Sequence, residues 1–423
     1  MFKKQKINST VYYIFFLSVL KILFGFYLAH TNPDFFFTPD SSEYIDAANS
    51  MCKTGKFNDI NGYPEIKRLP GLSIFLMPAA CFKIDLKNYI IFLNMFMLLL
   101  SAYFTFKIIK LININISILF VFLIFLLDPT LTRYQYNILS EITFLFFFTS
   151  SIYSLIYGFK KTNLYYLFSG FFLITSATFI RPLLLYLPYF LFGCLILFYF
   201  FSPNFRSKFN YLFLFVSFLG LLVHFSLTKI WIERNYKLSG VREFTYIKSI
   251  NSYYYLNAGI VAKSENKKFE NVREELRIKS NNLSKIDFVN FSKSELKKNI
   301  FKFPFETMMV GLEGAMMIFI TPGTGQYSRL FKIDEKKYQI MNYIFNTIGF
   351  IWILIMGIFT IFGFIKINKN IFTLILILFF IYLLIVSSGP MSYSRFRIPF
   401  IPILSVFIAL GIEIFLKFIK KFK

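Results

Sequence analysis

The chain has 423 residues, of which 56% are hydrophobic and 21% are aromatic, and its formal net charge is +24. This composition excludes a soluble globular protein, because several runs exceed the roughly 18 apolar residues that are typical of a membrane-spanning helix. Nucleic acid is excluded as a partner, since the basic residues are divided between both expected sides of the membrane. We therefore expect an all-α polytopic membrane protein.

The first predicted element is a membrane span at about residues 11–29. It follows the basic start MFKKQK, so the positive-inside rule places the N-terminus in the cytoplasm. The segment is too long for a removable signal peptide and lacks a small-residue cleavage signature, so we interpret it as an anchor. About ten spans are expected in total, the others being at about 88–107, 111–127, 138–157, 164–180, 183–201, 210–230, 340–364, 371–387 and 398–416.

The loops that this topology assigns to the cytoplasm are basic. They read KIIK, GFKKTN, SPNFRSK and KINKN, and the C-terminal end reads KFIKKFK. We therefore expect a multi-pass protein of the plasma (inner) membrane with both termini in the cytoplasm. A span at residues 307–320 would move two of these basic clusters outside, so we interpret that apolar segment as a helix that lies at the outer interface or re-enters the membrane.

Three parts follow from this topology. Residues 1–230 form an N-terminal membrane domain that contains the first outer loop, at 30–87. Residues 231–339 form an outer-face lid with an interfacial helix, and residues 340–423 form the C-terminal membrane helices. The long segment 231–306 is basic, but long loops are exempt from the positive-inside rule. Its charge suits anionic lipid or phosphate, so membrane lipids are expected partners.

Cysteine and histidine are scarce. The chain has 3 Cys and 2 His, which leaves little material for a His-rich metal site. Cys52 and Cys81 are expected on the same side of the membrane and could pair if that side is oxidising. We favour the interpretation that all three cysteines are unpaired small hydrophobic residues.

The first outer loop carries an acidic stretch, FFFTPDSSEYIDAANSM, at residues 35–51. Its DSSE is a helix-capping pattern, in which the Asp40 side chain can accept backbone N–H bonds and Glu43 supports the helix start. Asp46 is interpreted as a solvated position. The same loop continues with RLPGLSIFLMP, an apolar segment that begins at Arg68 and is too short to span.

Further charged residues gather at the outer ends of other spans. Taken alone, each is commonplace, because an Arg at a helix end extends its charge to the interface and a Glu in a first turn suits the helix dipole. Taken together, they place ionisable groups of both signs on one face of the membrane. They are Asp128, Arg133, Glu141, Arg181, Arg234, Arg395 and Arg397.

The order of these motifs resembles the GT-C membrane glycosyltransferases, in particular the bacterial branch similar to protein O-mannosyltransferases and to the lipid A aminoarabinose transferase (glycosyltransferase family 39-like). An Asp four residues before a Tyr opens the first outer loop, as Asp40 and Tyr44 do here. RLPGLSIFLMP, LSEITFLF, IRPLLL, RNYKLSG and SRFRIPFIP then follow in the family's order over nearly the whole chain. Many members carry Asp-Glu at the first motif, whereas this chain has Ser41, which counts against a two-carboxylate or metal-bound site.

The resemblance implies transfer of a hexosyl- or pentosyl-type sugar from a polyprenyl-phosphate donor to a lipid, glycan or protein acceptor at the outer face, with inversion, in modification of lipopolysaccharide or another cell-envelope glycan. It implies that Asp40 is the general base and that Glu141 positions the acceptor or orients an Arg. No cofactor is assigned, and a divalent metal stays open. The donor phosphate is expected to contact Arg181, Arg395 and Arg397, with Arg234 in reserve, and the substrate to contact Tyr44, Tyr63 and Arg68.

Two other function classes remain alternatives. A transporter or flippase of lipid-linked sugars would also use many spans and a basic outer face, but usually shows repeated halves and ionisable groups near the midplane. The sequence shows no repeat, and its mid-span candidates are Lys21 and His224. A glycan polymerase or ligase is expected to lack the early Asp40 motif. A non-catalytic scaffold gives no reason for the clustered charges.

Overall fold

The computed structural model describes residues 2–203, 206, 211–324, 327, 335–366 and 371–421. These residues form helices joined by turns, with an isolated β-bridge between Asn58 and Pro64. The all-α fold class predicted from the sequence is confirmed. The first part of the chain contains α1 (Phe2–Thr31), η1 (Pro33–Phe36), α2 (Ser41–Thr54), α3 (Pro70–Cys81), α4 (Leu86–Leu111), α5 (Ile118–Leu127), α6 (Pro129–Tyr134), α7 (Glu141–Lys161), α8 (Leu164–Ile180), η2 (Pro182–Leu184), α9 (Leu187–Phe201) and α11 (Tyr211–Ser239).

The second part begins with a group of helices outside the predicted spans and ends with three apolar helices, of which α17 and α19 are long and α18 is shorter. The group is α12 (Ile247–Asn251), the π-helix η3 (Ser252–Asn257), α13 (Ala258–Ser264), α14 (Phe269–Ser280), α15 (Lys285–Lys302) and α16 (Pro304–Ile320). The end of the chain contains α17 (Glu335–Ile365), α18 (Ile371–Ser387), η5 (Ser394–Phe400) and α19 (Ile401–Lys421).

Seven of the ten expected spans coincide with segments that are long and apolar enough to cross a membrane. These segments are Thr10–Thr31, Leu86–Leu111, Glu141–Lys161, Pro182–Phe201, Tyr211–Ser239, Gln339–Ile365 and Ser394–Ile419. The other three expected spans form shorter apolar helices, α5, α8 and α18. A helix rises about 1.5 Å per residue, so α8 and α18 reach slightly less than the bilayer core and α5 about half of it.

The segment predicted to lie at the interface or to re-enter is α16, which meets α15 at a bend of 102°. Pro304 is the first residue of α16, where its missing N–H breaks no helical bond. A bend of this size fits a re-entrant segment or a broken span, so the expectation that α16 lies at the interface or re-enters the membrane stays a prediction. The basic loops SPNFRSK and KINKN lie largely outside the described residues, so the topology that they indicate stays a prediction.

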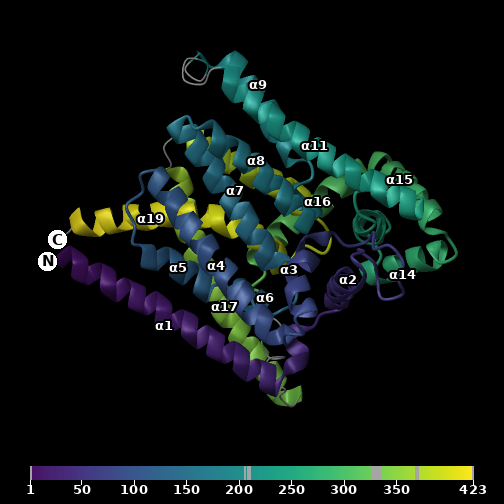
Figure 1. Cartoon of the computed structure of the whole chain (residues 1–423), viewed down its shortest axis with the longest axis horizontal. Helices are drawn as coiled ribbons and strands as arrows, with labels where there is room; N and C mark the ends of the chain where they lie inside the picture. Colours follow the sequence, from purple (N-terminus) through teal and green to yellow (C-terminus); the bar gives the residue numbers. More distant parts are fainter. Residues whose placement is uncertain are drawn as a thin grey trace.

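The two chain ends lie together at one end of the molecule, while α2, α14 and α15 lie at the opposite end (Figure 1). One continuous apolar core joins the long helices, and it includes Leu98, Phe125, Phe148 and Phe379. A second small core lies in segment 241–303, around Tyr253, Val272 and Phe288. The two termini are therefore far from the first outer loop and from segment 241–303. The predicted topology places the termini on one side of the membrane and these two segments on the other.

Segment 241–303, the part of the expected outer-face lid between α11 and α16, is attached to the first outer loop, and from here on we use the name lid for this segment alone. The backbone N–H of Tyr246 donates to the carbonyl of Ile66 at 2.9 Å. Arg234, near the end of α11, donates to the carbonyls of Glu65 at 2.6 Å and Phe57 at 2.9 Å. The lid therefore packs directly on the loop that contains the acidic stretch. The predicted boundary at residue 230, between the first two parts of the chain, falls inside α11, which runs on to Ser239. The division into three parts stays a prediction.

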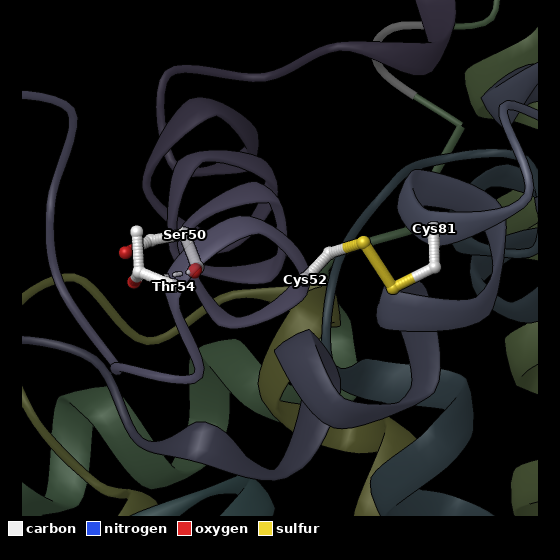
Figure 2. The surroundings of a disulfide bond; sticks show 4 residues. All are labelled: Ser50, Cys52, Thr54 and Cys81. Atoms are coloured by element: carbon white, nitrogen blue, oxygen red, sulfur yellow. Dashed lines mark hydrogen bonds between the residues drawn. A yellow bond between two sulfur atoms is a disulfide. The ribbon is translucent and has the colours of Figure 1, made fainter.

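A disulfide joins α2 to α3, with the Cα atoms of Cys52 and Cys81 5.4 Å apart (Figure 2). The favoured interpretation, that all three cysteines are unpaired, was therefore wrong, and the alternative that Cys52 pairs with Cys81 is the one that the structure has. Cys194 is free. The sequence could not decide whether the cysteines pair, because the disulfide requires α2 and α3 to pack side by side. The loop between these two helices contains Arg68.

Replacing both Cys52 and Cys81 by Ser is expected to lower the free energy of unfolding by about 3 kcal/mol, because the cross-link limits the entropy of the unfolded chain over a separation of 29 residues. Thermal unfolding in neutral detergent, followed by circular dichroism with and without reductant, measures the change. Cys194→Ser is the matched control and should leave Tm unchanged. A double variant with the Tm of the unreduced protein would contradict the prediction.

Candidate functional site

Asp40 stands immediately before α2, but its side chain makes no capping hydrogen bond. This corrects the capping role expected from DSSE. The carboxylate instead accepts from Arg68 Nη2 at 2.6 Å and from Arg395 Nη1 at 3.5 Å. The backbone at this corner is held by Ser41, whose hydroxyl accepts from the Thr38 N–H at 2.9 Å and donates to a carbonyl of a neighbouring segment. The Asp40 carboxylate therefore binds two guanidinium groups from distant segments and does not cap α2.

Glu43 lies nearly one helical turn further along α2 and forms ion pairs with Lys67 and with Arg68 Nε. Arg68 thus contacts two carboxylates with different nitrogens, and its guanidinium carbon lies 5.3 Å from the ring centre of the buried Tyr44. Glu43 therefore belongs to an ionic cluster. Lys67 was not among the predicted site residues, and its place next to Arg68 in EIKRLP was the only signal available.

A second set of contacts extends the cluster from three further segments. Glu141, at the start of α7, is fully buried and pairs with Arg395 Nε, while Arg181 Nη1 lies 3.1 Å from the same carboxylate oxygen. Arg181 lies between α8 and η2, and Arg395 lies in η5. We call the whole set the outer cluster. It consists of Asp40, Glu43, Lys67, Arg68, Glu141, Arg181 and Arg395.

Close helix packing brings these segments together. Gly71, in the first turn of α3, lies against the end of α8, where an added Cβ would be 2.8 Å from the carbonyl oxygen of Phe179 and 2.9 Å from Cα of Ile180. Only glycine fits so close to another backbone. The contact sets Arg68, just before α3, close to Arg181, just after α8.

The charges of the outer cluster do not balance. Its ion-paired side chains are four cations and three carboxylates, which leaves one excess positive charge among them. The neighbouring buried Glu65 carboxylate is not in an ion pair with the described residues and accepts from the backbone N–H groups of Lys67 and Arg68. Two buried polar atoms, Arg181 Nη1 and Glu141 Oε2, have no hydrogen-bond partner among the described residues. The Arg181–Glu141 pair is therefore a close ionic contact that is not aligned as a hydrogen bond. The hydrogen-bonding capacity of this Arg181 nitrogen is therefore not used by any described residue.

The electrostatic surroundings keep Asp40 ionised. Burial favours the neutral acid, but the charges and hydrogen bonds of Arg68 and Arg395 outweigh it and lower the pKa of Asp40 below its ordinary value of 3.8. Burial also disfavours charged Arg68, yet Tyr44, Asp40 and Glu43 raise its pKa overall. At neutral pH the cluster thus presents a carboxylate that can accept a proton, next to permanently charged guanidinium groups.

Other predicted site residues have different surroundings. Arg397 is only 5% exposed and donates to the carbonyls of Ile318 at 3.2 Å and Thr321 at 2.8 Å, at the C-terminal end of α16. Arg234 holds carbonyls of the first outer loop, as described above. Tyr63 is 66% exposed at the tip of that loop, where its backbone N–H donates to Asp59. None of these three forms an ion pair with the outer cluster in the described part of the chain.

Arg397→Met is expected to lower the free energy of unfolding by about 1–3 kcal/mol, because it leaves buried carbonyls at the end of α16 without their donor. The second nitrogen of Arg397, which donates to Thr130 Oγ1 at 2.8 Å, is lost as well. Thermal unfolding of the purified variant measures the effect. An unchanged Tm combined with weaker binding of a polyprenyl-phosphate donor would contradict this prediction and support the phosphate contact expected from the sequence.

Within the described ranges, no group of three or more His, Cys, Asp and Glu side chains is placed to hold a metal ion. The carboxylates of the outer cluster are instead bound by Arg and Lys. The cluster as described is therefore suited to anion binding and proton transfer.

No protein-family model matches the sequence, and no curated protein is detectably similar to it. The structure is similar to that of the archaeal oligosaccharyltransferase AglB from Archaeoglobus fulgidus, solved in complex with an inhibitory peptide and a dolichol-phosphate. The superposition has a TM-score of 0.52 at 10% identity and covers 97% of this chain but 51% of AglB. The chain thus spans about half the length of AglB, and at this identity the likeness shows a shared fold.

Proposed function

We propose that this chain is an integral-membrane glycosyltransferase, which moves a sugar from a polyprenyl-phosphate donor to an acceptor at the outer, periplasmic face. The observation that carries the proposal is the ionised Asp40 carboxylate between Arg68 and Arg395, in a cluster with an excess positive charge. Such a site combines a proton acceptor with cations that can bind a leaving phosphate. The fold shared with a protein solved with dolichol-phosphate supports this assignment.

The reaction proposed is a single displacement. An acceptor hydroxyl or amine attacks the anomeric carbon and gives its proton to Asp40, while the bond from that carbon to the phosphate oxygen breaks. The electron pair of that bond stays on the polyprenyl phosphate, whose growing charge is stabilised by guanidinium groups. Attack opposite the leaving group inverts the configuration of the sugar carbon.

Arg181 and Arg395 are the groups that we assign to the donor phosphate. Arg181 has a buried donor without a hydrogen-bond partner among the described residues, and Arg395 contacts both Asp40 and Glu141. Glu141 is fully buried, so we assign it the role of orienting these two arginines rather than of contacting the acceptor. The ring of Tyr44 packs against the guanidinium group of Arg68, and we assign the exposed Tyr63 to stacking on a sugar.

The excess positive charge favours a carrier with one phosphate. A polyprenyl monophosphate sugar is a phosphodiester with one negative charge, whereas a pyrophosphate diester carries two. One charge balances the outer cluster, and a second would require another cation. We therefore propose a monophosphate donor.

The test uses the purified full-length chain in nanodiscs, with envelope extract as the acceptor source and matched polyprenyl monophosphate and pyrophosphate sugars as donors. Mass spectrometry measures the free carrier that is released. Release of polyprenyl phosphate from the monophosphate donors, dependent on extract, is expected. Release from pyrophosphate donors alone would contradict the monophosphate assignment, and release from neither across a panel of sugars would contradict the transferase.

A further inference from the structure

A separate cavity of about 240 Å³ lies in the lid, between α15 and the segment around α12. No residue of the outer cluster lines it. Its polar lining consists of hydroxyl and ammonium groups with a single carboxylate. The serines are Ser249, Ser252 and Ser292, and the lysines are Lys248, Lys293 and Lys297.

The charge of this cavity is positive. Its carboxylate, Glu243, is buried and contacts both Lys293 and Lys248, the latter at 3.9 Å. One negative charge is therefore already shared by two lysines. Lys297 lines the same cavity and has no carboxylate partner among the described residues. The cavity consequently has two positive charges in excess.

The remaining wall is apolar. Leu296, Ile300 and Phe301, in the second half of α15, complete the lining, and the Phe301 side chain is 75% exposed. Directly after them the chain bends by 102° into the apolar α16. The cationic groups thus lie next to the point where the lid meets the predicted membrane surface. A ligand of this cavity should be an amphiphile, with an anionic group among the lysines and an apolar part beside Phe301.

We propose that this cavity binds the phosphate headgroup of an anionic membrane phospholipid. Lysine ammonium groups bind phosphate oxygens as point charges, and serine hydroxyls can donate to the same oxygens. Lys248 also donates to Tyr186 Oη at 3.2 Å, next to the start of α9, so the bound headgroup would lie between the lid and a membrane helix. This proposal does not depend on the transferase activity, because it concerns a different set of residues.

The test measures binding of short-chain phosphatidylglycerol to the full chain in neutral detergent by isothermal titration calorimetry. Short-chain phosphatidylcholine and inorganic phosphate are the comparison ligands. Lys297→Gln is the informative variant, because it breaks no ion pair among the described residues and should leave Tm unchanged. Lys298→Gln is the matched control, since Lys298 is the next residue of α15, is also exposed, and does not line the cavity.

Phosphatidylglycerol is expected to bind more tightly than phosphatidylcholine, and Lys297→Gln should raise its Kd about fivefold, the effect of one lysine near an anionic lipid surface. Lys298→Gln should leave the Kd unchanged. Equal binding of the two lipids, or equal effects of the two variants, would overturn the proposal. Tighter binding of inorganic phosphate than of phosphatidylglycerol would also overturn it, because the site would then serve a soluble anion.

Discussion

Asp40→Asn is expected to lower the kcat of sugar transfer by about 10²–10⁴-fold, the usual contribution of a general base. The amide has nearly the same shape as the carboxylate but cannot take the proton of the acceptor. Donor binding should change little, since Arg181 and Arg395 keep Glu141 as a partner. Initial rates of carrier release at varied donor concentration separate the two effects.

Asp46→Asn is the control for this variant. Asp46 lies on the same helix α2, and its replacement removes the same charge, but it has no ion pair with the described Lys and Arg residues. Its burial, together with the nearby Asp59 and Glu43, raises its pKa, whereas Asp40 has a lowered pKa. Transfer should continue at the full rate. Equal activity of the unmodified protein and Asp40→Asn would remove Asp40 from the role of base.

The pH dependence follows from the sign of the Asp40 shift. The pKa of Asp40 is lower in the folded chain than its ordinary value of 3.8. The ionised carboxylate, and the stability that its ion pairs contribute, are therefore fully present above pH 3.8 and are lost as the pH falls through the folded pKa. The acidic limb of kcat/KM for the free enzyme should therefore lie below pH 3.8. A limb near neutrality that persists in Asp40→Asn would assign proton transfer to another group.

Arg181→Gln is expected to lower kcat/KM for the donor by about 10²–10³-fold, as is typical when one donor to a developing anion is removed. In this variant the buried Glu141 carboxylate is still paired with Arg395, so the protein should still fold. Arg181→Lys should recover part of the rate, because it restores the charge without the planar guanidinium group.

Arg242→Gln is the matched control for Arg181→Gln. It removes a guanidinium from the lid, where Arg242 is exposed and pairs with Glu233. Unfolding curves of both variants report on folding, and donor titrations report on binding. A loss in Arg242→Gln as large as that in Arg181→Gln would indicate a general effect of surface charge and would contradict a specific phosphate contact at Arg181.

Hydropathy and charge patterns were sufficient for the fold class and for the expectation that ionisable residues gather at one face. Glu141, Arg181 and Arg395 were selected because they stand at the outer ends of predicted spans, and Asp40 because it opens the acidic stretch of the first outer loop. The four residues do converge in the structure. The hydropathy pattern predicts the side of the membrane on which each helix end lies, because a span has one end on each side. The same pattern does not predict which helix ends become neighbours.

The parts that the sequence could not predict all depend on distant partners. Arg395 and Arg397 stand two residues apart in the same motif, yet one pairs with carboxylates while the other binds the carbonyls at the end of α16. Asp40 has the residue type and position of a helix cap, but guanidinium groups 28 and 355 residues away take its carboxylate. Local patterns carry no information on such contacts.

The most direct test of the central claim compares cell-envelope glycans and lipids from cells that produce the unmodified chain, the Asp40→Asn variant or neither. Mass spectrometry should find an envelope component that is heavier by one sugar residue only when the unmodified chain is present, together with accumulation of polyprenyl-phosphate sugar in the other two. Identical envelope and carrier profiles in all three, with both forms of the chain folded in the membrane, would contradict the assignment of this protein as a glycosyltransferase.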